Sequence, residues 1–184
     1  LNLDMVPDGT PRTQWRPQYP NIIYERALNY YGDSSALFTT GNVTSYLTYF
    51  QPNTVPGLVA CPTVSKKLST MTSADINTYI DSLTAVGATY HDIGMIWGGR
   101  LISPTGLFAS ENADVGGVPT SRNLIFLTDG ETAPMDVAYG AYGIEPLDRR
   151  RWTMNSPETL TDVVERRFSI ACSEVKRRNV TVWV

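Results

Sequence analysis

The sequence predicts an α/β fold in which amphipathic helices pack against a parallel sheet. The first indication is the segment 124–127, where Leu-Ile-Phe-Leu runs without polar alternation, as in a strand covered on both faces. The second is the order of the elements, because from residue 72 onward the pattern gives helix, helix, strand, helix and strand. The third is Thr128-Asp129-Gly130, where the central strand ends, since open α/β sheets bind ligands at the carboxyl ends of their strands.

Helix signals lie on both sides of the central strand, which we expect over 123–128. Ser73 is expected to cap a first helix that runs to about Thr84. The last helix is expected to start at Ser156-Pro157-Glu158, where a capping Ser is followed by Pro and by an acid at the positive end of the helix dipole. A final strand over 180–184 follows it. The predicted inward residues are Ile76, Ile80 and Leu83 in the first helix, and Leu160, Val163, Val164, Phe168, Ala171 and Val175 in the last.

Another helix is expected between the first one and the central strand, ending near Ile102. Thr89 lies at or near its N-cap, where a side-chain oxygen can accept hydrogen bonds from free backbone N–H groups. Gly94 and Gly98 give one side of this helix a smooth surface, which predicts close approach to the sheet. Its buried face is predicted from helical spacing to contain Ile93, Ile96, Trp97 and Leu101.

Composition indicates one globular domain of ordinary size. The chain has 184 residues, of which 42% are hydrophobic and 18% are charged, and its net charge is −3. The cationic run 149–151 is interpreted as a solvated loop or a pairing site for carboxylates, and no nucleic-acid partner is expected. No apolar run reaches the ~20 residues that a membrane-spanning helix needs. Residues 1–70 are expected to form a loop-rich, aromatic-rich insertion in the domain whose core is 71–184.

The sequence offers no catalytic constellation. Its only histidine, His91, is expected to be a hydrogen-bonded structural residue rather than a ligand or a base. Neither a G-x-S-x-G nucleophile elbow nor a phosphate-binding Gly loop with its Lys is present. We therefore expect no enzymatic activity.

Two motifs resemble a known family. A G-x-T turn at 87–89 enters a helix with a W-G-x-R-L pattern, and the next apolar strand ends in T-D-G, as in von Willebrand factor A-type domains. Within that superfamily, the segments 89–106 (TYHDIGMIWGGRLISPTG) and 139–149 (YGAYGIEPLDR) resemble the A-type domain of TadG-like proteins of tight-adherence (Flp-type) pilus assembly. The resemblance covers about Met71 to Val184. It implies a doubly wound, mostly parallel, Rossmann-like sheet with helices on both faces.

The same family often carries a metal-ion-dependent adhesion site at the carboxyl edge of the sheet. That site combines an Asp-x-Ser-x-Ser motif with a Thr, which Thr89 matches, and a later Asp, which Asp129 matches; Glu131 and Asp136 are outer-shell candidates. The Asp-x-Ser-x-Ser motif is absent from this chain, so its oxygens fall short of the about six that Mg²⁺ prefers. We therefore expect a divalent cation, with Mg²⁺ favoured, to bind this chain weakly or not at all.

The missing motif predicts either a degenerate site or a chain that is a piece of a longer protein. The second is favoured, with a first strand expected upstream of Leu1 and the end of the domain expected beyond Val184. The resemblance implies an extracytoplasmic location (periplasm or cell envelope), with inner-membrane anchoring through a segment outside this chain. In that location a disulfide between Cys61 and Cys172 is expected, and two unpaired thiols are the alternative.

The resemblance implies a function in adhesion. It indicates a non-enzymatic protein-binding module in the assembly or anchoring of Flp-type pili, whose partners are pilus-assembly or cell-envelope proteins. Two alternatives stay open: the A-type domain of a chelatase-like multi-subunit enzyme complex, and a structural scaffold with a dead metal site. The segment 89–94 and the aromatic-rich insertion favour the pilus module over the chelatase subunit.

Overall fold

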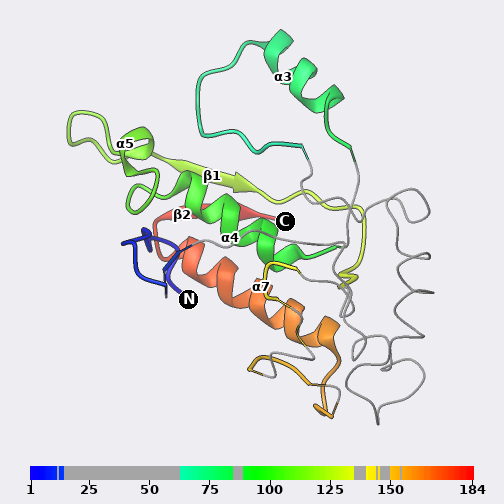
Figure 1. Ribbon diagram of the computed structural model, residues 1–184. Helices are drawn as coiled ribbons and strands as arrows, with labels where there is room; N and C mark the ends of the chain where they lie inside the picture. The colour runs from blue at the N-terminus through cyan, green and yellow to red at the C-terminus, as the bar shows by residue number, and fades with distance from the viewer. Residues whose placement is uncertain are drawn as a thin grey trace.

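The protein is described here by a computed structural model (Figure 1), which covers residues 1–11, 13–14, 63–84, 89–134, 140–143, 145, 150–153 and 155–184. None of the helices in these ranges is long and apolar enough to cross a membrane. The elements are α3 (Ser73–Asp81), α4 (His91–Ile102), α5 (Ala109–Asn112), β1 (Arg122–Ile125), α7 (Leu160–Lys176) and β2 (Val180–Trp183). The short helix α5 lies in the connection between α4 and β1.

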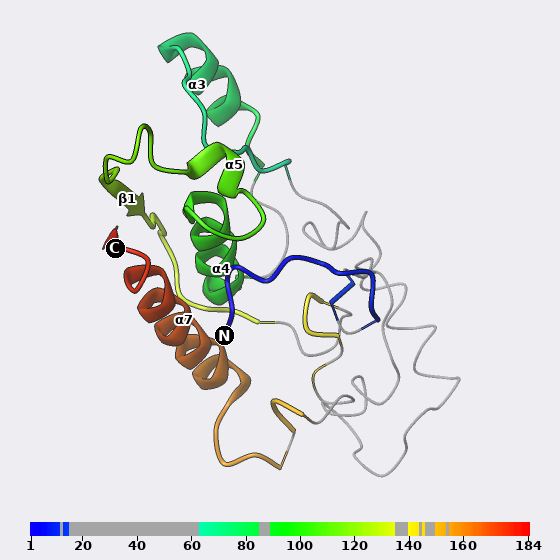
Figure 2. The ribbon, with the colours of Figure 1, turned by 90° about the vertical axis from the view of Figure 1, so that its left-hand side faces the viewer.

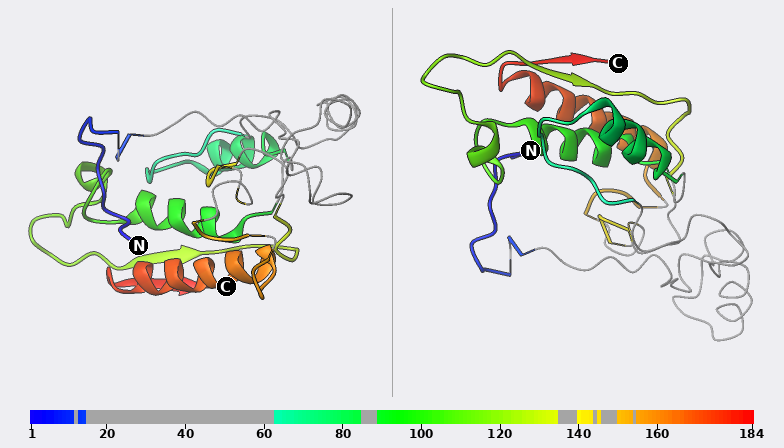
Figure 3. Two further views of the ribbon diagram at one scale, coloured as in Figure 1. Left: turned by 60° about the horizontal axis from the view of Figure 1, so that its bottom comes forward. Right: turned by 90° about the horizontal axis from the view of Figure 1, so that it is seen from above.

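The two strands pair in parallel and share one layer of helices. In the register of β1 and β2, Leu124 lies opposite Val182. Both α4 and α7 lie on the same side of the strand pair, as the view from above shows (Figure 3, right). The main core lies between these two layers and contains Leu3, Met95, Ile102, Leu124, Ala171, Val175 and Val180. Mixed helix and strand with a parallel pair agrees with the predicted α/β class.

The outer face of the strand pair differs from the prediction. Leu124 is buried, but Ile125 is 76% exposed and Leu127 is 92% exposed. Side chains alternate across a strand, so only the face toward α4 and α7 is covered within the described residues. The apolar run 124–127 was therefore wrongly interpreted as a strand buried on both faces. The strand is also shorter than expected, although the N–H of Phe126 still donates to the carbonyl of Trp183 at 2.8 Å.

Glycines allow α4 to lie close to its neighbours, as the sequence predicted. A Cβ on Gly98 would stand 2.9 Å from Leu124 Cδ1, and one on Gly94 would stand 3.2 Å from the Phe126 ring. The side of α4 that carries these glycines therefore rests on β1. The fully buried side is different from the predicted one, because Met95, Gly99 and Ile102 face α7 and Leu3, while Ile93, Ile96, Trp97 and Leu101 are only half-buried.

Replacement of these glycines by alanine should have graded effects. At Gly99 the new methyl would stand 2.5 Å from Val175 Cγ2 and 2.8 Å from Leu3 Cδ1, so we expect a loss of about 1–3 kcal/mol in the free energy of unfolding. At Gly94 the contact is milder, and the better helix propensity of alanine, worth up to about 1 kcal/mol, should offset it. Urea denaturation of the two variants measures the difference. A greater loss for Gly94→Ala than for Gly99→Ala would contradict this packing.

The helices α3 and α7 begin with the same capping motif. Thr72 caps α3 and Thr159 caps α7, and in each case an Asp three residues later bonds back to the cap, as Asp162 does to the N–H of Thr159 at 2.8 Å. The expected cap at Ser73 was one residue late. The expected cap at Ser156 was three residues early, because its side chain instead accepts from the N–H of Thr153 in a preceding turn.

The prediction that the apolar residues of α3 are buried is wrong. The helix has no buried residue, and its Ile76 and Ile80 are 43% and 55% exposed. Leu83, which follows the helix, is 52% exposed. α3 also ends at Asp81, earlier than expected. It stands apart from α4 and α7 in two views at right angles (Figures 1 and 2), so no other described helix covers its apolar side.

The inward stripe predicted for α7 is confirmed. Leu160, Val164, Ala171 and Val175 are buried, and the other two predicted residues, Val163 and Phe168, are half-buried. At the end of the helix, Arg178 Nη1 donates to the carbonyl oxygen of Glu174 at 2.5 Å. A cation therefore lies at the negative end of the helix dipole.

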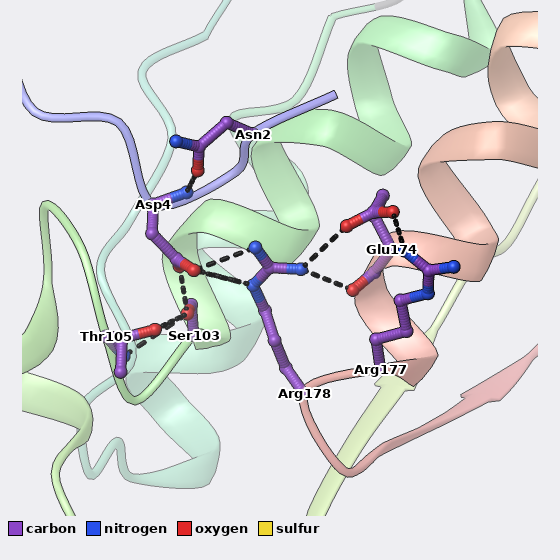
Figure 4. Close-up of polar contacts among 7 residues, drawn as sticks. All are labelled: Asn2, Asp4, Ser103, Thr105, Glu174, Arg177 and Arg178. Carbon is purple, nitrogen blue, oxygen red and sulfur yellow. Dashed lines mark hydrogen bonds and ion pairs between the residues drawn. The ribbon is translucent and has the colours of Figure 1, made fainter.

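The first residues of the chain are part of the core. Leu3 is 1% exposed and packs between α4 and α7. Next to it, Asp4 accepts hydrogen bonds from Arg178 Nη2 at 2.7 Å and from the hydroxyl of Ser103 at 2.7 Å (Figure 4). The Arg178 guanidinium lowers the pKa of the Asp4 carboxyl. Gly106, at φ +83°, must be glycine because a Cβ there would stand 2.6 Å from the Cα of Asp4.

Candidate functional site

The carboxyl end of β1 is joined to the start of α4 by backbone hydrogen bonds. The N–H of Thr89 donates to the carbonyl of Ala133 at 3.0 Å, and the N–H of Ala133 donates back to Thr89 at 3.1 Å. This two-way bridge holds the segment 128–133, which follows β1, against the residues that precede α4. We call the segment 128–133 the edge loop. The fold therefore brings Thr89 of the first motif beside the edge loop, which contains the second motif.

His91 makes a second connection to the edge loop. Its Nε2 lies 3.1 Å from the Thr128 hydroxyl, and its Nδ1 lies 3.0 Å from the Thr132 hydroxyl. A neutral imidazole has one donor and one acceptor nitrogen, and a hydroxyl can take either role, so both hydrogen bonds can form together. The ring packs edge-on against Phe126 and Phe168, with centroid distances of 5.6 and 6.1 Å. These contacts fit the prediction of a structural, hydrogen-bonded histidine.

The predicted ligand residues lie around this loop, but they do not complete a metal site. Thr89 is half-buried, while Asp129 and Glu131 are exposed. Asp136 lies outside the described residues. No group of three or more His, Cys, Asp or Glu side chains in the described part of the chain could hold a metal ion. One hydroxyl and one or two exposed carboxylates do not fit a hard divalent cation that takes about six oxygens.

The N-cap of α4 is Tyr90 rather than Thr89, and its side chain makes no capping hydrogen bond. Thr89 instead belongs to the backbone bridge, one residue before the helix. Cys172 is half-buried on α7 beside the main core, and Cys61, its predicted disulfide partner, lies outside the described residues.

A buried polar cluster lies on the other side of α4's first turn, and the sequence analysis did not identify it. Asp92 is 0% exposed and accepts from the Tyr142 hydroxyl at 2.8 Å. Glu145, 4% exposed, is paired with Arg167, whose Nη2 lies 2.5 Å from Oε1. The same guanidinium lies 3.8 Å from Asp92 Oδ2, measured from Nη1. We call these four side chains the buried cluster.

The buried cluster contains two carboxyl groups but one cationic side chain. Burial raises the pKa of Asp92 and also that of Glu145, and hydrogen bonds from Tyr142 and Arg167 only partly oppose this effect. Burial likewise raises the pKa of Tyr142, so its hydroxyl stays protonated. Within the described residues, Glu145 Oε2 and Arg167 Nη1 have no hydrogen-bond partner. Two buried carboxyls thus share one guanidinium, with bonding capacity left over.

A comparison with known protein families, with curated proteins and with solved structures found no match for this chain. Function must therefore be argued from the residues of the site.

Proposed function

We propose that this chain is part of a von Willebrand factor A-type, doubly wound domain that acts as a non-enzymatic, extracytoplasmic protein-binding module in Flp-type pilus assembly. The observation that carries the proposal is the joining of the edge loop to the start of α4 through Thr89, Ala133 and His91. A Thr just before a helix, beside the segment that follows a strand, is the arrangement that the family resemblance implies. It leaves Asp129 and Glu131 exposed at the carboxyl end of β1, where open α/β sheets bind ligands.

The partner proposed for this edge is a pilus-assembly or cell-envelope protein. Photo-crosslinking in the producing cells tests this, with a photoreactive residue at Asp129 or Glu131 and a matched control at Glu165, an exposed carboxylate on α7. We expect crosslinks to a pilus or envelope protein from the edge positions but not from the control. The same crosslinks from all three positions, or none from either edge position, would refute a binding edge. Crosslinks to an ATPase partner would favour the chelatase-like alternative.

A divalent cation is proposed to have at most a minor part in this chain. Calorimetric titration with Mg²⁺ and with Mn²⁺ should give a Kd of about 10⁻³ M or weaker, because a hydroxyl and exposed carboxylates are few ligands. Any heat of binding should disappear in Asp129→Ala and in Thr89→Ala, and it should persist in the control Glu165→Ala. Tight binding that survives both substitutions would place a cation site elsewhere. A complete lack of binding, together with no edge crosslink, would favour the scaffold with a dead metal site.

A further inference from the structure

The turn 140–143 is attached to the helices through the buried cluster. The turn is closed by two backbone hydrogen bonds between Gly140 and Gly143, at 3.1 and 2.9 Å. Tyr142, at its tip, donates to Asp92 on α4, and its ring lies 4.2 Å from the guanidinium of Arg167 on α7. Two residues beyond the turn, Glu145 is paired with the same Arg167. Side chains of the buried cluster therefore join this segment to α4 and α7.

We propose that Asp92 and Glu145 form a proton-dependent clamp, which holds the turn 140–143 against α4 and α7 while one proton is shared between the two carboxyls and loosens it when both ionise. With one proton, a single carboxylate balances Arg167, and the buried cluster is neutral. With none, two buried carboxylates face one guanidinium, and an uncompensated negative charge remains inside the protein. The Tyr142 hydroxyl donates to an ionised Asp92 or accepts from a protonated one, so this contact is available in both states.

Other described charged groups near the cluster do not compensate the second carboxylate. Among the described groups, Arg151 has its guanidinium 5.2 Å from the Tyr142 ring centroid and donates to the carbonyl of Tyr142 at 3.3 Å. Its charge lowers the pKa of Glu145, but less than Arg167 does, and the pKa stays raised by burial. Arg100 of α4 interacts electrostatically with Tyr142, but its guanidinium lies 5.2 Å from the Trp97 ring centroid. His91 points to the edge loop instead. Arg167 is the only described cation paired with the two carboxyls at 4 Å or less.

The direction of the pH dependence follows from the raised pKa of each carboxyl. Their ordinary values are 3.8 for Asp92 and 4.5 for Glu145, and burial raises both in the folded protein. A carboxyl with a raised folded pKa stabilises the fold fully below its ordinary value and loses this contribution as the pH rises through the folded value. The clamp therefore loosens as the pH rises through these raised pKa values and the last proton leaves the pair of carboxyls.

Amide hydrogen exchange followed by NMR tests the clamp. The readout is the protection factor of the Gly140 and Gly143 amides, corrected for intrinsic exchange, from pH 4 to pH 8. We expect it to fall with rising pH in the wild-type protein, by up to about tenfold per pH unit for one linked proton. Asp92→Asn and Glu145→Gln each leave one carboxylate for Arg167, so both variants should keep these amides protected at pH 8, above the wild-type level.

The control Glu165→Gln removes an exposed carboxyl on α7 and should keep the wild-type pH profile. A merely structural role for Glu145 predicts the opposite of the clamp, namely lower protection in Glu145→Gln at every pH. A flat wild-type profile from pH 4 to pH 8 would overturn the proposal, as would an unchanged pH dependence in both variants. Because no partner or cation enters the measurement, its result is independent of the proposed binding edge.

Discussion

Replacement of Arg167 by methionine should lower the free energy of unfolding by about 3–5 kcal/mol at pH 7. The side chain of Arg167 is 15% exposed, and its two carboxylate partners are 0% and 3% exposed, so water cannot solvate the charges that the substitution leaves unpaired. Methionine keeps much of the apolar contact with the Tyr142 ring. The loss in the free energy of unfolding therefore reports mainly on the removal of the Arg167 charge from its two carboxylate partners. Urea denaturation followed by circular dichroism measures it.

The matched control for this prediction is the neighbouring residue. Arg166 is also paired with a carboxylate, Glu158, but its side chain is 56% exposed, so Arg166→Met should change the free energy of unfolding by less than about 1 kcal/mol. The penalty of Arg167→Met should also shrink toward pH 4, where the two buried carboxyls take up protons. Equal, small effects of the two methionine substitutions would show that the cluster is solvated and would contradict its burial.

The features that the sequence predicted correctly are those with a local signal. The inward stripe of α7 follows from helical spacing, and the close approach of α4 to β1 follows from Gly94 and Gly98. The caps could also have been found, because Thr72 and Thr159 each precede an Asp by three residues, which is the capping-box pattern. At the start of α7, the Ser-Pro sequence was the more conspicuous signal, but it forms a turn instead.

The features that the sequence did not predict depend on contacts between distant segments. Asp92, Glu145 and Arg167 lie in three separate segments, and each looks like an ordinary surface charge in its own local pattern. The candidate edge was predicted in part: Thr89 and the edge loop do meet, through the backbone of Ala133 rather than through ligand oxygens. Exposure of Ile125 was not predictable either, since an apolar run does not reveal which of its two faces is covered.

Replacement of Leu3 by alanine should cost about 2–5 kcal/mol in the free energy of unfolding, although the residue stands near the start of the chain. Its side chain is 1% exposed within the main core, whereas Leu1 is 57% exposed, so Leu1→Ala is the matched control and should be nearly neutral. The double variant Leu3→Ala/Gly99→Ala should lose less free energy of unfolding than the sum of the losses in the two single variants. The reason is that Leu3 Cδ1 is one of the two close atoms that a methyl on Gly99 would meet. Val175 Cγ2, the other atom, stays in place, so the rescue should be partial. Strict additivity in urea denaturation, or a Leu3→Ala loss no larger than that of Leu1→Ala, would mean that the first residues do not pack between α4 and α7.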